Sequence, residues 1–160
     1  MKYFEYGKEN KELVVILHGG GVSYRGAEPT AKIVAEKYHV ILVAYDGFNP
    51  SEPDTEFVSV QNEARRLGDY IAENYGGHID ILYGLSYGGR VLMEVLADKR
   101  LSVTGTVDKK LSANLKKLKG QGYPFRYKIF TELGHGGLAG EQPERFLKEM
   151  INVHEAQKGI

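Results

Sequence analysis

Runs of consecutive apolar residues are the most regular pattern along the chain. Three of them are prominent and rich in β-branched residues: Leu13–Leu17, Val40–Ala44 and Ile79–Tyr83. A continuous run, rather than the alternation of a half-exposed strand, is typical of parallel strands that helices cover on both faces. We therefore predict three buried strands here. Leu101–Gly105 and Arg126–Thr131 are weaker candidates of the same kind.

Apolar residues at helical spacing lie between these runs. The clearest helix is framed by Ser59, a residue type that caps helix starts, and by Gly76, a residue type that ends helices. Further helices are predicted over Pro29–Tyr38, after Ser86 and from about Pro143 onward.

Strands that alternate with helices predict an α/β fold. We expect a three-layer sandwich in which helices cover both faces of a mostly parallel central sheet, formed by one domain over residues 1–160. Lys2–Tyr6 is expected to add a short edge strand. Ligands of such sheets bind at the carboxyl ends of the strands. His18, Asp46 and Ser86 each follow a predicted strand, so this edge is where we expect a site.

Composition narrows the classes of function. Lys and Arg together number 21, as do Asp and Glu, so no bulk charge favours nucleic acid or an anionic membrane. The chain has no cysteine, which excludes disulfides, thiolate metal sites and a cysteine nucleophile. Its apolar runs are far shorter than the roughly 20 residues of a membrane span. We expect a cytoplasmic protein whose partner is a small molecule.

Ser86 is the strongest candidate for chemistry. It stands in Gly84-Leu85-Ser86-Tyr87-Gly88, between a buried strand and an amphipathic helix. A sharp turn at this place would expose the serine oxygen above the sheet, at the positive end of the helix. The structural alternative is an ordinary turn in which Ser86 only caps the helix. The position of the motif between strand and helix favours a nucleophile.

A serine nucleophile needs a general base, and His135 is the best candidate. It follows the last predicted strand, between Gly134 and Gly136. His39 and His78 precede their strands, at the opposite edge of the sheet.

Asp108 is the predicted acid that orients His135. It follows the strand candidate Leu101–Gly105 and could alternatively cap the next helix. Glu132 is a second candidate acid, and Asp98 fits less well because it ends the helix that Ser86 begins.

The glycines after the first buried strand, in His18-Gly19-Gly20-Gly21, predict an oxyanion hole. Glycine lets the backbone approach a substrate closely and present its N–H groups. We expect the donors to be Gly20, Gly21 and Tyr87.

A dinucleotide-binding loop is the competing interpretation of these glycines, and Asp46 could then bind a ribose. The Gly-x-Gly-x-x-Gly spacing fails, however, because a motif starting at Gly19 would need glycine where Tyr24 stands.

Taken in order, these motifs resemble those of the α/β-hydrolase superfamily over nearly the whole chain. The matching parts are His18–Gly21, Asp46–Ser51, Gly84–Gly89, Asp108 and His135. The resemblance implies a serine hydrolase that cleaves a carboxylic ester through a Ser86-His135-Asp108 triad and an acyl-enzyme. It implies no metal and no organic cofactor.

The chain departs from the family pattern after the helix that Ser86 begins. Only a short segment separates Ala97 from Asp108, so the cap and one strand–helix unit of larger members are missing. We expect an open pocket with Tyr24 and Phe48 in its wall, and surface that a second copy could cover in a homodimer. The alternative function is a weakly active or inactive hydrolase fold that binds a ligand or partner.

Overall fold

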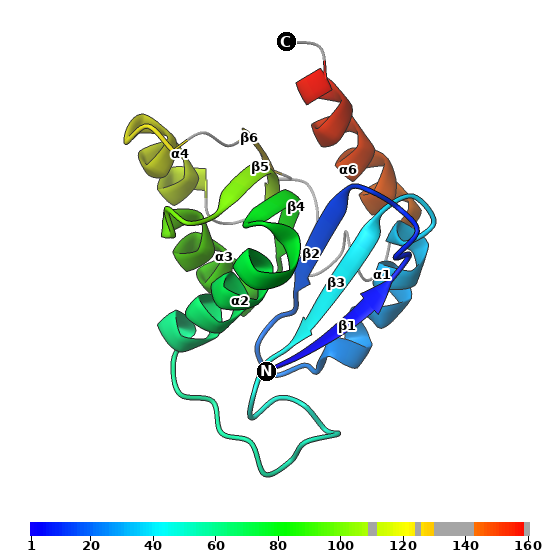
Figure 1. Ribbon diagram of the computed structural model, residues 1–160, viewed down its shortest axis with the longest axis vertical. Coiled ribbons are helices and arrows are strands. Elements are labelled where there is room, and N and C mark those ends of the chain that lie inside the picture. Colours follow the sequence, from blue (N-terminus) through cyan, green and yellow to red (C-terminus); the bar gives the residue numbers. More distant parts are fainter. Residues whose placement is uncertain (109–111, 124–125, 130–142, 159–160) are drawn as a thin grey trace.

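A six-stranded sheet lies between two layers of helices in the computed structural model, which describes residues 1–108, 112–123, 126–129 and 143–158 (Figure 1). The strands are β1 (Lys2–Tyr6), β2 (Leu13–Leu17), β3 (His39–Ala44), β4 (His78–Gly84), β5 (Ser102–Asp108) and β6 (Arg126–Ile129). Their spatial order is β1-β3-β2-β4-β5-β6. All neighbours are parallel except β1 with β3, which are antiparallel. The predicted α/β sandwich and the edge strand are confirmed.

The helices divide between the two faces of the sheet (Figure 1). They are a single 3-10 turn (Tyr24–Gly26), α1 (Glu28–Val34), α2 (Val60–Tyr75), α3 (Tyr87–Ala97), α4 (Ser112–Gly120) and α6 (Pro143–Lys158). The helices α1 and α6 cover one face, whereas α2 and α3 cover the other, with α4 beside α3. Within the described ranges, no helix has the length and apolar character needed to cross a membrane.

Cover on both faces explains the continuous apolar runs. Every residue of β2 is buried. Leu13, Val15 and Leu17 pack into the core under α2 and α3. Val14 and Ile16 point the other way, into the core under α1 and α6. Because successive side chains of a strand face opposite sides of the sheet, neither side of this strand can be polar.

The boundaries of α2 agree with the prediction. The Ser59 hydroxyl accepts a hydrogen bond from the Asn62 N–H at 3.0 Å, and Gly76 ends the helix in the left-handed conformation (φ 61°). The helix predicted over Pro29–Tyr38 is shorter, because α1 ends at Val34. Beyond it, the N–H groups of both Lys37 and Tyr38 donate to the carbonyl of Val34, at 3.1 Å each, so the chain tightens into a turn.

The segment after α3 is as short as expected, and no cap is inserted in it. Only Asp98–Leu101 joins α3 to β5, which pairs directly with β4. The strand itself begins one residue later and ends three residues later than the predicted Leu101–Gly105. Asp108 is therefore the last residue of β5 and does not lie beyond it.

A change in the direction of winding opens the carboxyl edge of the sheet between β2 and β4. These strands are neighbours, with Leu17 paired to Gly84 at their ends. After β2 the chain passes to α1 on one face, whereas after β4 it passes to α3 on the other. The two exits diverge at the place where ligands of such sheets commonly bind.

Candidate active site

Ser86 stands at the apex of the turn from β4 into α3 in a strained backbone conformation. It has φ 53° and ψ −105°, and it alone has a positive φ among the described residues other than glycine. Such a conformation costs about 1–3 kcal/mol and persists only where surrounding structure enforces it. The residue is exposed, and its side chain makes no capping hydrogen bond to α3. The helix-capping interpretation of Ser86 is therefore wrong.

Two glycines of the motif are required by backbone packing. A Cβ on Gly84 would lie 2.7 Å from the carbonyl oxygen of Gly88, and one on Gly88 would lie 2.2 Å from that of Leu17. The Leu85 N–H also donates to the Leu17 carbonyl at 3.0 Å. The turn thus rests directly on the end of β2, and there is no room for side chains between them.

The glycine loop after β2 lies against this turn. A Cβ on Gly19 would be 3.6 Å from the Ser86 Cβ, and one on Gly20 would be 3.2 Å from the Tyr87 Cβ. Gly21, by contrast, has no neighbour within 4 Å of its Cβ position. The loop therefore meets Ser86 and Tyr87 through Gly19 and Gly20, and Gly19 is not among the predicted oxyanion donors.

His18 holds the orientation of this loop. Its Nδ1 lies 2.8 Å from the carbonyl oxygen of Gly19, so Nδ1–H is the donor and the carbonyl accepts. Burial lowers the pKa of His18 below its ordinary value, although the bond to Gly19 acts in the other direction. Because C=O and N–H of a trans peptide point in opposite directions, the Gly20 N–H is directed away from His18.

Tyr87 carries a second backbone donor beside the glycine loop. It is the first residue of α3, so its N–H has no acceptor within the helix. Gly20 and Tyr87 are two of the three predicted oxyanion donors, and they lie next to each other.

The predicted acid and base are described only in part. The backbone of Asp108 ends β5 on the same edge as Ser86 and is in register with Ile129 of β6. The side chain of Asp108 lies outside the described part of the structure, as do His135 and Glu132.

The other candidate acids and bases are placed away from Ser86. His39 and His78 begin their strands at the opposite edge, where they bond to Glu5 at 2.8 Å and to Asp80 at 3.2 Å. Asp98, at the far end of α3, is held by the guanidinium of Arg100 at 2.7 Å.

Aromatic rings gather next to Ser86. The ring of Tyr87 lies 5.6 Å from that of Phe57 and 6.3 Å from that of Phe48, and Phe48 and Phe57 are 5.7 Å apart. Phe48 was predicted as a wall residue, but Phe57 was missed. Tyr24, the other predicted wall residue, is buried and stacks on Phe4 at 4.2 Å, so its ring belongs to the core.

Asp46 has partners that occupy its carboxylate. The amino group of Met1 and the guanidinium of Arg66 both bond to it. Burial raises the pKa of Asp46, but these two cations outweigh it and leave the pKa below its ordinary value. An acid engaged in this way offers no free carboxylate to a ribose, which removes the support for a dinucleotide site.

Glu63 lies beside this ion pair and is fully buried. Its carboxylate is 4.0 Å from the guanidinium of Arg66. Burial, followed by the charge of Asp46, raises the pKa of Glu63 above its ordinary value.

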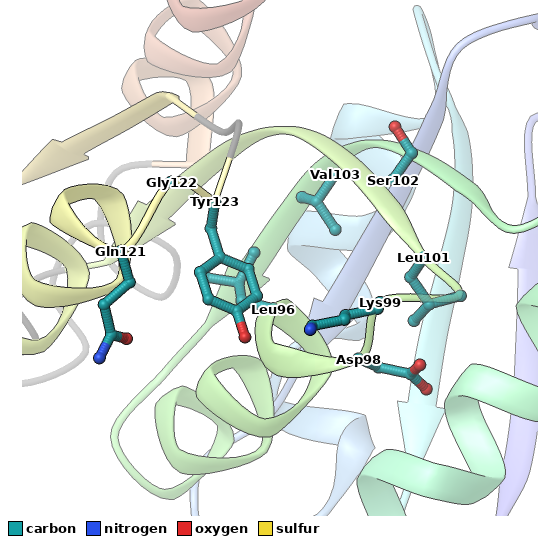
Figure 2. Close-up of a pocket in the computed structure, with 9 residues that line it drawn as sticks. All are labelled: Leu96, Asp98, Lys99, Leu101, Ser102, Val103, Gln121, Gly122 and Tyr123. Atoms are coloured by element: carbon teal, nitrogen blue, oxygen red, sulfur yellow. The ribbon is translucent and has the colours of Figure 1, made fainter.

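Figure 2 shows the residues that line a cavity of about 590 Å³. Ser102, which begins β5, is one of them, so the cavity lies at the opposite end of the sheet from Ser86. Its lining combines the end of α3, the start of β5 and the turn after α4, and includes Leu96, Lys99, Ser102 and Tyr123. Because it is at the amino edge, this cavity is separate from the candidate active site. In the described ranges, no group of three or more His, Asp or Glu side chains could hold a metal.

Comparison with known proteins shows the fold. No family model matches the chain. A protein from Desulfitobacterium hafniense described as an alpha/beta hydrolase family protein superposes with a TM-score of 0.74 at 14% identity, over 95% of this chain and 99% of that one. A lipase-esterase related protein from Clostridium acetobutylicum superposes with a TM-score of 0.70 at 15% identity, over 95% of this chain and 98% of that one.

A larger protein, serine hydrolase CCSP0084 from Cycloclasticus zankles, gives a TM-score of 0.55 at 20% identity, over 66% of this chain and 39% of that one. The chain therefore has the α/β-hydrolase fold. The near-complete mutual coverage of the first two structures shows that other chains of about this length adopt the same fold.

The contact of Gly88 with β2 can be tested by adding one methyl group. We expect Gly88→Ala to lower the free energy of unfolding by about 3 kcal/mol or more, because its Cβ would overlap a backbone carbonyl that cannot move aside. Gly26→Ala is the matched control, since nothing lies within 4 Å of its Cβ position. Urea unfolding of both variants measures the effect, and equal stabilities would contradict this packing.

The raised pKa of Glu63 predicts a pH-dependent stability. A folded-state pKa above the unfolded value stabilises the protein at low pH, and this contribution is lost as the pH rises from about 4.5 through the folded value. We expect Glu63→Gln to gain stability relative to the natural chain over that range, by about 1.4 kcal/mol per unit of pKa difference.

Urea unfolding of both chains at pH 4 and pH 7 tests this expectation. The groups that face Glu63 are Asp46, Arg66, the Met1 amino group, Tyr3 and Tyr45. Glu73→Gln, at an exposed position of the same helix, is the control. A pH-independent difference between Glu63→Gln and the natural chain would refute the burial effect.

Proposed function

We propose that the protein is a serine hydrolase that cleaves a carboxylic ester through Ser86, with His135 as base and Asp108 as the orienting acid. One observation carries the proposal: the strained, exposed Ser86 lies against the Gly19–Gly20 loop, beside the Tyr87 N–H, which has no acceptor within its helix. This arrangement supports a role for Ser86 as nucleophile and for the neighbouring N–H groups as oxyanion donors.

In the proposed mechanism, His135 takes the proton of Ser86 as Oγ attacks the carbonyl carbon of the ester. The N–H groups of Gly20 and Tyr87 stabilise the oxyanion, and Asp108 orients the imidazolium. The tetrahedral intermediate expels the alcohol, which receives its proton from His135. Water then attacks the acyl-enzyme by the same route and releases the acid.

The hydrogen bond from His18 suits this mechanism. The buried ring holds the Gly19 carbonyl in one orientation. The Gly20 N–H is then preorganised before substrate arrives, so little reorganisation is needed when the negative charge develops.

Structural similarity supports hydrolysis in general. A serine hydrolase and a lipase-esterase related protein are among the structures with this fold. One fold hosts many activities, so the preference for esters over thioesters, lactones or acyl transfer rests on the site and on experiment.

A fluorophosphonate probe tests the nucleophile directly. We expect it to label Ser86, and we expect Ser86→Ala to abolish labelling and to lower ester turnover by a factor on the order of 10⁴ or more. Ser102→Ala, at the opposite edge of the sheet, is the matched control. We expect this variant to retain both labelling by the probe and ester turnover. Peptide mass mapping locates the label. A folded protein without label would instead support the ligand-binding alternative.

The absence of a cap between α3 and β5 predicts a preference for short acyl chains. Each methylene that the protein buries is worth about 0.8 kcal/mol, or roughly fourfold in kcat/KM, and an open site cannot provide this gain along a long chain. We expect kcat/KM for p-nitrophenyl esters to stop rising beyond the shortest acyl groups. A steady rise through octanoyl and longer esters would disprove an open site.

A further inference from the structure

The three aromatic rings beside Ser86 form a surface that the proposed chemistry does not use. We call Phe48, Phe57 and Tyr87 the aromatic wall. All three side chains are half-buried, so each keeps ring surface open to a ligand. Tyr45 is buried behind them, with ring centroids 6.3 Å from Tyr87 and 6.5 Å from Phe48, and it supports the wall from within.

The loop between β3 and α2 holds two of these rings in place. Gly47 has φ 74°, and a Cβ on it would lie 2.9 Å from the backbone nitrogen of Phe57, so the start of the loop touches its end. The Gly47 N–H donates to the Thr55 hydroxyl at 3.1 Å, and that hydroxyl donates to the Glu52 carbonyl at 2.8 Å. Asn49 is buried and donates to the Glu52 carboxylate at 2.9 Å.

These hydrogen bonds join residues within the loop between β3 and α2. They therefore hold the rings of Phe48 and Phe57 in fixed positions. Ordered, hydrogen-bonded loops on a rigid sheet commonly carry binding residues. The ring planes of Phe57 and Phe48 meet at 78°, and those of Phe57 and Tyr87 at 72°, so the wall presents both faces and edges.

The order of the strands in the sheet indicates which part of a substrate would contact the aromatic wall. The loop that carries Phe48 and Phe57 follows β3, whereas His135 follows β6 in the sequence. β3 and β6 lie on opposite sides of β4, the strand that leads to Ser86. In the proposed mechanism the leaving group receives its proton from His135, so the group on the β3 side is the acyl group.

We propose that the aromatic wall binds an aryl ring on the acyl side of the substrate, and that Phe57 determines this specificity. The inference rests on the proposed function, since it needs an acyl group on Ser86. An aryl ring gains from edge-to-face and offset contacts with such a wall beyond the area it buries, whereas a flexible alkyl chain gains only area. A single ring also fits a site that has no cap to enclose a longer chain.

Two sulfonyl fluorides test the proposal through one covalent step. In each, the Ser86 Oγ forms a bond to sulfur, the S–F bond breaks, and fluoride leaves with the serine proton as HF. Phenylmethanesulfonyl fluoride places an aryl ring where the acyl group would lie, and methanesulfonyl fluoride does not. The second-order labelling rates are measured by intact mass, and peptide mapping confirms the site.

The ratio of the two rates is compared between variants, so that the intrinsic reactivity of each reagent cancels. We expect Phe57→Leu to lower the ratio of aryl to methyl labelling about three- to tenfold, the value of one aromatic contact. Phe57→Tyr retains an aromatic ring, so we expect it to leave the ratio of aryl to methyl labelling unchanged. Val58→Leu is the control, since Val58 is the next residue and is 72% exposed. Phe48→Leu replaces Phe57→Leu if circular dichroism shows that the latter is unfolded.

The outcomes separate the two proposals. An unchanged ratio in Phe57→Leu, or an equal loss in Val58→Leu, overturns the aromatic wall while leaving the nucleophile intact. If neither reagent labels folded protein, the proposed function fails. The wall is then judged by saturation-transfer NMR with methyl phenylacetate: binding that Phe57→Leu abolishes supports an aryl site, and no binding to the natural chain overturns it.

Discussion

The contact between Gly88 and the end of β2 is the constraint on which the site depends. The backbone of α3 lies directly on the carbonyl of Leu17, with no side chain between them. This close approach forces the chain to turn from β4 into α3 within a few residues, and the turn drives Ser86 to a positive φ. It also brings the loop that follows Leu17 against Ser86 and Tyr87. One steric contact thus brings Ser86 and the neighbouring N–H donors together.

The direction of the parallel strands separates the site at Ser86 from the polar groups at the amino edge of the sheet. Residues at the carboxyl ends of β2, β4 and β5 share one edge, whereas His39, His78 and the cavity near Tyr123 belong to the other. Between the edges, every strand residue of β2 is apolar and buried on both faces. Ser86 lies at the edge where β2 and β4 send the chain to opposite faces of the sheet, which is where ligands of such sheets commonly bind.

The sequence predicted the features that local pattern controls. Continuous apolar runs located the buried strands, and the glycines around Ser86 located the turn, because each has a local steric cause. Features that depend on distant contacts were missed or misplaced. Tyr24 joins the core because Phe4, from the edge strand, stacks on it. Phe57 reaches the site because Gly47, at the start of the same loop, leaves room for its backbone.

The glycine loop after β2 shows the same limit of sequence-based prediction within a few residues. The run of glycines predicted a close approach to the substrate, but consecutive glycines carry no side-chain pattern that tells one from the next. The structure distinguishes them by packing: Gly19 and Gly20 face the turn at Ser86, whereas no atom of the described residues lies within 4 Å of the Cβ position of Gly21. The hydrogen bond from His18 to Gly19 sets the peptide orientation, and a bond between adjacent residues of this kind leaves no periodic signal.

Stability alone gives no account of a serine at position 86. The backbone there has a positive φ, which glycine adopts freely and which costs another residue about 1–3 kcal/mol. A serine at the start of a helix usually recovers energy by capping it, yet the Ser86 side chain makes no such bond. Glycines occupy the positions around it where room is short, so the turn itself does not require a side chain. The strain is therefore better explained by the chemistry of an exposed hydroxyl than by the fold.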